Sequence, residues 1–174
     1  MDDRFDLSGR VALVTGGSRG LGREMVMAFA EHGADVLIAS RKIEACEELA
    51  AEVRDRTGRR AVAAAFHAGR WEQADELADL VYSEFGRCDV LVPHAGMSPL
   101  YPSLPEVSEE LFDKVVGVNF KGPFRLASLI GTRMAEGDGG SIINVSSIAA
   151  VAPTPHELVY AGAKAALDAM TSGM

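Results

Sequence analysis

Short apolar segments alternate with segments of helical periodicity along the chain. The apolar segments are Val11–Thr15, Val36–Ser40, Ala61–Phe66, Asp89–Val92 and Ser141–Ser146. They are apolar at successive rather than alternate positions, which is typical of parallel strands covered on both faces. The helical segments are Gly20–His32, Lys42–Thr57, Trp71–Phe85, Ser108–Glu136 and Pro155–Met174.

This alternation predicts an α/β fold with a doubly wound, parallel, Rossmann-type sheet of strand order 3-2-1-4-5. No linker, repeat or low-complexity segment interrupts the 174 residues, so a single domain over residues 1–174 is expected. Ser108 is a predicted N-cap of the long helix. Thr154 and Glu157 resemble a capping box, with Pro155 at the first position of the last helix.

Composition and charge exclude several classes of partner. The net charge of −8 disfavours nucleic acid and anionic membrane surfaces, and no apolar run is long enough to span a bilayer. Cys46 and Cys88 lie outside any Cys/His cluster, so no metal site is predicted. Two isolated cysteines and the charged segment Met1–Arg4, which lacks an apolar signal core, favour a cytoplasmic location.

A glycine-rich turn, TGGSRGLG over residues 15–22, separates the first predicted strand from the first helix. Glycine lets backbone approach a phosphate closely, and a helix start offers free N–H groups and a positive dipole end. The alternative is a tight turn without a ligand, but the strand before it and the helix after it favour dinucleotide binding. The predicted contacts are Gly16, Ser18, Arg19, Gly20, Leu21 and Gly22.

The end of the second strand favours NADP(H) over NAD(H). NAD-preferring sites carry an acid there that holds the ribose 2′-hydroxyl, whereas this chain has Ser40, Arg41 and Lys42. Arg41 is suited to bind a 2′-phosphate bidentately, and Arg19 is close enough in the predicted fold to assist. The alternative is that Arg41 and Lys42 only solvate a helix start.

Four further residues suggest acid–base chemistry. Tyr160 and Lys164 are four positions apart, so they share one helix face, and a nearby ammonium lowers the pKa of a phenol. Ser147 follows the fifth predicted strand, where a hydroxyl can hydrogen-bond a carbonyl. Pro123 cannot donate to the carbonyl of Asn119, which leaves that carbonyl free to accept a hydrogen bond from a water. A surface pair and a simple helix kink are the alternatives.

These motifs resemble the short-chain dehydrogenase/reductase family. TGxxxGxG, the VNFKG segment with Asn119, Ser147 and the YAGAK segment from Tyr160 to Lys164 occur in its order and spacing over nearly all of the chain. The resemblance implies that Tyr160 exchanges the proton and that Lys164 holds the nicotinamide ribose and lowers the pKa of Tyr160. It also implies that Ser147 orients the carbonyl and that Asn119 holds a relay water.

The implied activity interconverts a small-molecule carbonyl and a secondary alcohol, similar to that of 3-oxoacyl-carrier-protein reductases. The family usually carries Asn-Asn-Ala-Gly after the fourth strand, where this chain has Pro93-His94-Ala95-Gly96. Ala95 and Gly96 keep the expected cofactor contacts. Pro93 removes a ladder donor, and His94 is expected to fill the wall where asparagine normally stands.

The family usually continues with further strands after the YxxxK helix, so we expect a chain truncated after that helix. A non-catalytic nucleotide-binding or oligomerisation module derived from the family is the alternative function. Family members pair through the two helices that correspond to Ser108–Glu136 and Pro155–Met174. The resemblance therefore implies a homodimer or homotetramer, with Leu167 and Met170 expected on an exposed apolar face.

Overall fold

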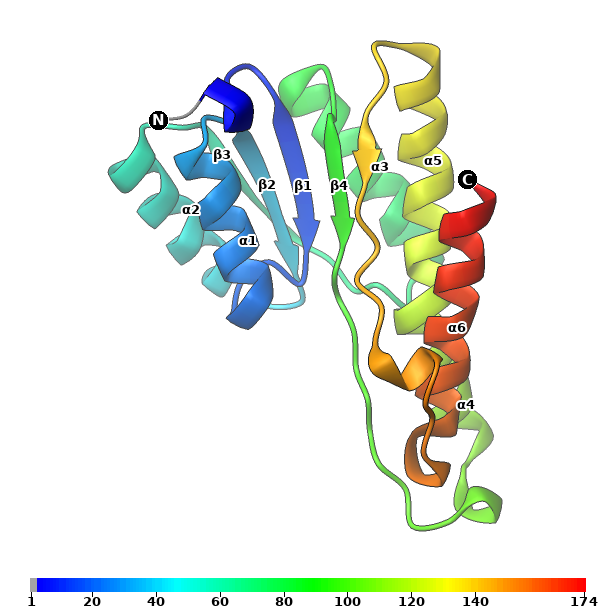
Figure 1. The fold of residues 1–174 in the computed structure, drawn as a ribbon. Coiled ribbons are helices and arrows are strands. Elements are labelled where there is room, and N and C mark those ends of the chain that lie inside the picture. The colour runs from blue at the N-terminus through cyan, green and yellow to red at the C-terminus, as the bar shows by residue number, and fades with distance from the viewer. Residues whose placement is uncertain (1–2) are drawn as a thin grey trace.

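The computed structural model describes residues 3–174. Met1 and Asp2, part of the segment predicted to lack a signal core, lie outside the described residues. A parallel five-stranded sheet of order β3-β2-β1-β4-β5 forms the centre (Figure 1), which confirms the predicted doubly wound topology. The strands are β1 (Val11–Thr15), β2 (Asp35–Ser40), β3 (Ala61–Ala65), β4 (Val90–Pro93) and β5 (Ser141–Ile142).

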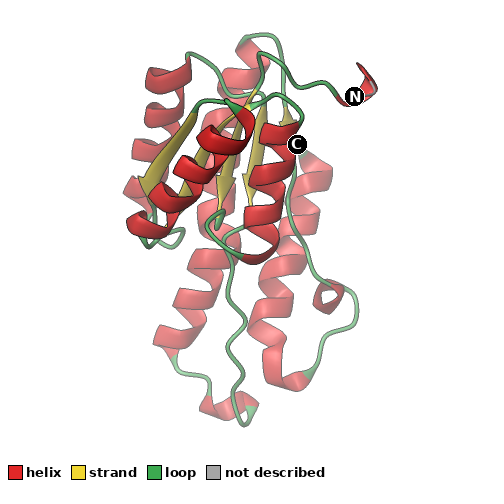
Figure 2. Cartoon of the chain, turned by 90° about the vertical axis from the view of Figure 1, so that its left-hand side faces the viewer, coloured by secondary structure: helices red, strands yellow, loops and turns green. Residues whose placement is uncertain are grey.

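Helices cover both faces of this sheet (Figure 2). One face is covered by α1 (Gly20–Glu31) and α2 (Ile43–Thr57), and the other by α3 (Trp71–Phe85) and α5 (Gly122–Glu136). α4 (Glu109–Val116) leads into α5, and α6 (Leu158–Gly173) packs against both. Among the residues that the structure describes, no helix is long and apolar enough to span a membrane.

The sheet separates two hydrophobic cores. Leu13 and Leu91 pack with α3 and α5, whereas Val14 and Val92 pack with α1 and α2. Neighbouring strand residues therefore bury their side chains on opposite faces, which explains why the strands are apolar at successive positions.

The helix predicted over Ser108–Glu136 contains a π-helical turn, Gly117–Lys121, between α4 and α5. The N–H of Gly122 donates to the carbonyl of Gly117, five residues back. Pro123 has no N–H for the carbonyl four residues back, that of Asn119, so the ladder shifts by one residue there. The irregularity predicted at Asn119 is therefore a π turn.

The fifth strand is shorter than predicted. The sequence suggested Ser141–Ser146, but only Ser141–Ile142 pairs with β4. The N–H of Ile143 still donates to the carbonyl of Leu91 at 2.8 Å. The next bond of a parallel ladder would need an N–H from Pro93, which has none, so pairing ends there.

Three expectations for the last helix are wrong. Thr154 does not cap the backbone, because its hydroxyl donates to the Glu157 carboxylate at 3.2 Å. Pro155–Glu157 forms a 3-10 turn, and α6 begins at Leu158. Leu167 is fully buried within its own chain, since the face of α6 that carries it is covered by neighbouring helices.

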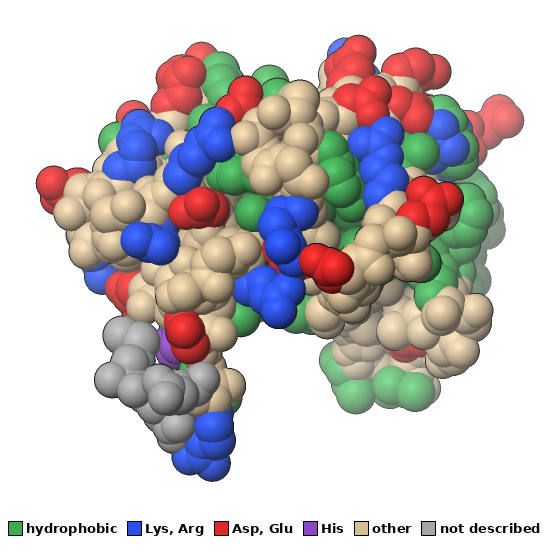
Figure 3. Space-filling view, turned by 90° about the horizontal axis from the view of Figure 1, so that it is seen from above, with side chains coloured by type: hydrophobic (Ala, Val, Ile, Leu, Met, Phe, Trp, Pro, Cys, Tyr) green, Lys and Arg blue, Asp and Glu red, His purple; other side chains and the backbone are tan. Residues whose placement is uncertain are grey.

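The amino ends of the strands form a face on which acidic and basic side chains are interspersed (Figure 3). Asp89, just before β4, accepts hydrogen bonds from the N–H of Val11 at 2.9 Å and from the guanidinium of Arg10 at 2.9 Å. The guanidinium of Arg87 adds two more bonds, from Nε at 2.8 Å and from a terminal nitrogen at 2.5 Å. This carboxylate ties the start of β1 to the start of β4.

Candidate active site

The predicted site residues follow the carboxyl ends of β1, β2, β4 and β5, at the edge where doubly wound sheets bind ligands. The β1–α1 turn shows why glycine is needed. Gly16 and Gly20 have φ angles of +67° and +55°, which other residues rarely adopt. A Cβ on Gly22 would lie 2.2 Å from the carbonyl oxygen of Gly16, and a Cβ on Gly16 would lie 3.0 Å from the backbone of Ala95.

This turn therefore leaves its backbone free of side chains at the start of α1. Arg19 precedes the helix in an extended conformation and makes no side-chain cap bond to it, and Leu21 is 67% exposed. The free N–H groups of the first turn of α1 are the kind of donors that hold a pyrophosphate. The glycine cradle thus fits a dinucleotide.

The β1–α1 turn and the adjacent end of β2 each carry one of the two arginines predicted to choose the cofactor. Arg19 and Arg41 are exposed and follow paired strands. The Ser40 hydroxyl lies 3.3 Å from the carbonyl of Lys42 and 3.1 Å from the Cys46 sulfur. Ser40 is therefore engaged within the chain, while the arginine side chains point to solvent.

Asn119 is fully buried, and its side chain ties the π turn to the segment after β4. Its Nδ2 donates to the carbonyls of Met97 at 2.8 Å and Val115 at 2.9 Å, and its Oδ1 accepts from the N–H of Met97 at 3.2 Å. A Cβ on Gly96 would lie 3.0 Å from this oxygen. The amide predicted to help seat a water fixes the backbone beside Gly96.

Tyr160 and Lys164 come together on α6. Lys164 is only 5% exposed, and its Nζ lies 5.8 Å from the centre of the Tyr160 ring. The ammonium donates to the carbonyl of Val145 at 2.6 Å, and burial lowers the pKa of Lys164. Ser147, half-buried after β5, accepts from the N–H of Ala149 at 3.2 Å.

Buried polar atoms without partners gather at this edge. Among the described residues, four buried side-chain atoms have no hydrogen-bond partner, and three of them follow β4 and β5: His94 Nδ1, Asn144 Oδ1 and Ser146 Oγ. Burial lowers the pKa of His94, and the nearby charge of Lys164 lowers it further. Such orphaned atoms indicate a place for water or ligand.

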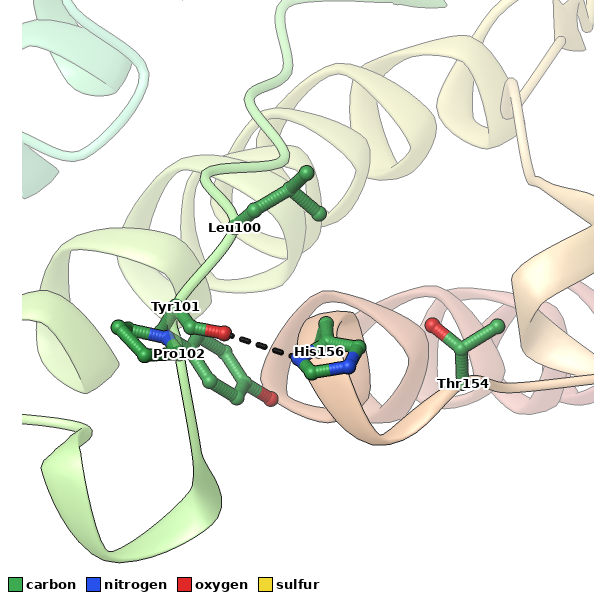
Figure 4. A pocket seen from close by; sticks show the side chains of 5 residues that line it. All are labelled: Leu100, Tyr101, Pro102, Thr154 and His156. Carbon is green, nitrogen blue, oxygen red and sulfur yellow. Dashed lines mark hydrogen bonds between the residues drawn. The ribbon is translucent and has the colours of Figure 1, made fainter.

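A surface hollow of about 570 Å³ lies between the β4–α4 and β5–α6 loops, lined by Leu100, Tyr101, Pro102, Thr154 and His156 (Figure 4). The His156 ring nitrogen lies 3.1 Å from the Tyr101 carbonyl, and the N–H of Val159 donates to the Tyr101 hydroxyl at 3.3 Å. Tyr101 was not predicted as a site residue, because these partners are 55 and 58 residues away from it in the sequence. The feature of the sequence that could have pointed to Tyr101 is the proline-rich segment Met97–Val107, which contains it.

The chain is similar to known proteins over most of its length. Residues 10–174 match the family model described as short chain dehydrogenase. A short-chain type dehydrogenase/reductase from Picea abies is 37% identical over 172 residues, covering 95% of this chain and 64% of that protein. The chain thus spans about two thirds of the length of the curated relatives it matches.

Solved structures of oxidoreductases have the same fold as this chain. A metagenomic short-chain oxidoreductase in complex with NADP superimposes with a TM-score of 0.91 at 30% identity, covering 96% of this chain and 75% of that one. An NAD+-bound xylitol dehydrogenase gives a TM-score of 0.89 at 27% identity, covering 95% and 64%. Proteins that bind either nicotinamide cofactor therefore share this architecture.

Proposed function

Because the chain belongs to the short-chain dehydrogenase family, we propose that it is an NADP(H)-dependent oxidoreductase that interconverts a carbonyl and a secondary alcohol. The observation that carries the proposal is the buried Lys164 ammonium beside the Tyr160 ring, at the same edge of the sheet as the glycine cradle. Residues 1–174 would form one dinucleotide-binding and catalytic domain.

The β1–α1 turn would hold the pyrophosphate, with Ala95 and Gly96 on the opposite wall. Gly16 already lies against the backbone of Ala95, so both walls of the cradle are formed by backbone. When bound, the cofactor supplies or accepts the hydride. The proposed cofactor-binding residues are Gly16, Ser18, Arg19, Gly20, Leu21, Gly22, Ser40, Arg41, Ala95, Gly96, Tyr160 and Lys164.

The preference for NADP(H) rests on charge. Arg41 is exposed just after β2, Arg19 is exposed in the β1–α1 turn, and no acid stands at residues 38–42 to repel a 2′-phosphate. A planar guanidinium matches a phosphate bidentately. The fold alone does not choose between the cofactors, since its relatives include both kinds.

In reduction, the Tyr160 hydroxyl would donate its proton to the carbonyl oxygen, and in oxidation the phenolate would accept it. The Lys164 ammonium lies beside the Tyr160 ring, and the carbonyl of Val145 fixes that ammonium in place. Ser147 would hydrogen-bond the substrate oxygen. Asn119 would act by holding the Met97 backbone, which shapes the wall beside Gly96.

The hollow beside the start of α6 offers a place for the organic part of a small-molecule substrate. Leu100 and Pro102 give it an apolar side, and Thr154 and His156 add polar groups. We therefore expect a carbonyl compound that carries an apolar substituent.

Self-association is a further part of the proposal. Phe112 on α4 and Phe124 on α5 are 49% and 44% exposed along the helical segment expected to pair in a dimer or tetramer. Apolar side chains exposed together on helices favour such pairing. A sharp monomer mass in solution at micromolar concentration would contradict it.

Cofactor titration tests the proposal. We expect tighter binding of NADPH than NADH, with the preference reversed in Arg41→Asp, because this change removes the phosphate partner and adds a ribose acceptor. Arg59→Asp, a charge change at another surface arginine, is the matched control and should leave the preference unchanged. Wild-type preference for NADH would contradict the choice of cofactor.

The alternative, a non-catalytic nucleotide-binding module, is favoured by the change to Pro93 and His94 after β4. Turnover separates the two functions. NADPH oxidation driven by ketones, measured on protein expressed from its complete reading frame, supports the enzyme. NADPH binding without any turnover across a ketone panel supports the module.

A further inference from the structure

The helix that carries Tyr160 and Lys164 is not capped by its own preceding residues. Glu157, the residue before α6, makes no side-chain cap bond, and the Thr154 hydroxyl is used by the Glu157 carboxylate. The first N–H groups of a helix have no partner within it. Val159 carries one of these N–H groups, at the position that a capping side chain normally serves.

Tyr101 supplies the missing cap from the other loop. Its hydroxyl accepts from the N–H of Val159 at 3.3 Å, although the two residues are 58 positions apart. Its side chain is only 6% exposed, so little water is available to replace this bond.

A second bond holds the same residue on the other side of the helix start. His156 Nδ1 lies 3.1 Å from the Tyr101 carbonyl, as the dashed line in Figure 4 shows. A carbonyl can only accept, so this ring nitrogen carries the proton. Tyr101 thus touches the chain both before α6 and in its first turn.

We propose that Tyr101 is a positioning residue for Tyr160. Val159 directly precedes Tyr160, so the cap fixes the first turn of α6 and with it the placement of the phenol. Lys164 is anchored separately, through the Val145 carbonyl. The distance between the Tyr160 phenol and the Lys164 ammonium therefore depends on two contacts. The Val145 carbonyl holds the ammonium, and Tyr101 holds the helix turn that carries the phenol. This inference rests on the proposed function.

Tyr101→Phe tests it by removing only the hydroxyl. We expect kcat to fall about tenfold, since small displacements of a reacting group are costly, while the Kd for NADPH stays within about twofold. The KM for the ketone should stay within about twofold, because the change falls on the placement of Tyr160 and not on substrate binding. Exchange of the Val159 amide hydrogen should accelerate.

Tyr82→Phe is the matched control, because it removes a hydroxyl on α3 away from the site and keeps the ring beneath Arg133. His156→Ala removes the second bond to Tyr101 from an exposed ring and should lower kcat about threefold. This surface variant keeps the test open if Tyr101→Phe proves poorly folded by melting temperature and NADPH binding.

The outcomes are distinct. If Tyr101→Phe folds and matches Tyr82→Phe in kcat and in Val159 amide exchange, the positioning role is overturned. If Tyr101→Phe does not fold and His156→Ala behaves as wild type, it is also overturned. Full activity in Tyr160→Phe would instead overturn the proposed function, whatever Tyr101 does.

Discussion

Buried polar groups have hydrogen-bond partners at one end of strand β4 and lack them at the other. At the amino end, the Asp89 carboxylate accepts bonds from two arginines and from the Val11 backbone. At the carboxyl end, the His94 ring nitrogen and the Ser146 hydroxyl are buried without partners, near a buried Lys164 ammonium.

This difference separates an end of the sheet whose polar groups stabilise the fold from the end at which we propose that the cofactor and substrate bind. Buried polar groups normally find partners within the protein, as at Asp89. A cluster that violates this rule is expected where function requires it. Substitutions at the amino end should therefore change the free energy of unfolding with little effect on kcat. Substitutions at the carboxyl end should change kcat with little effect on the free energy of unfolding.

The largest expected effect is at the carboxyl end. Tyr160→Phe should lower kcat for carbonyl reduction by about a thousandfold or more, because it removes the proposed general acid. Steady-state turnover on protein from the complete reading frame, with NADPH binding measured by fluorescence, checks this. Binding should stay nearly unchanged, since the proton is transferred only as hydride arrives.

Full activity in this variant would show that Tyr160 is not the acid. Loss of NADPH binding together with activity would show instead that the phenol mainly holds the cofactor. Both results would remove the proposed division of roles between Tyr160 and Lys164.

Ser147→Ala should have a smaller effect on the same reaction. Loss of one preorganised donor to a developing oxyanion raises the barrier by about 2–3 kcal/mol, so kcat should fall about a hundredfold. Steady-state kinetics measures this directly. Ser141→Ala, at the exposed start of β5, is the matched control and should keep the wild-type rate.

At the amino end, Asp89→Asn should lower the free energy of unfolding by about 2 kcal/mol and leave kcat unchanged. The value is moderate because Arg10 and Arg87 are partly exposed, and water screens the pairs. Urea denaturation checks the stability. A fall in kcat with stability unchanged would contradict the division between the two ends.

Acid sensitivity gives the same test a second readout. Burial alone would raise the pKa of Asp89, but the hydrogen bonds from Arg87, Val11 and Arg10 hold it below its ordinary value of 3.8. The unfolded chain therefore takes up this proton at higher pH than the folded chain. Stability from Asp89 is present above this ordinary value and is lost as pH falls through the folded pKa. Asp89→Asn should lack this loss.

The sheet was predictable because its signals are local. Successive apolar residues in β1, β2 and β4 encode strands buried on both faces, and the glycine turn encodes the switch from β1 to α1. The π turn at Asn119 also followed from a local cause, the missing N–H of Pro123. The roles of Asn119, Ser147, Tyr160 and Lys164, and the choice of cofactor, stay predictions.

What the sequence did not predict depends on partners far along the chain. β5 ends early because its neighbour presents Pro93, a consequence that appears only when the two strands are paired. Leu167 is buried by helices that precede it. The cap of α6 comes from Tyr101 rather than Thr154. In each case the prediction relied on neighbouring residues in the sequence, whereas a contact with a distant residue determined the structure.

The smallest expected effect is a pH dependence at the carboxyl end. Burial, with help from the Lys164 charge, lowers the pKa of His94 below its ordinary value of 6.5. As pH falls below this ordinary value, the unfolded chain binds a proton that the folded chain refuses, so the free energy of unfolding decreases. His94→Asn removes this group and should reduce the loss of stability between about pH 7.5 and about pH 5.5. Urea denaturation at both values measures the difference, with His156→Asn, at an exposed ring, as the matched control. An equal loss of stability in His94→Asn and wild type would show that folding does not disfavour protonation of His94.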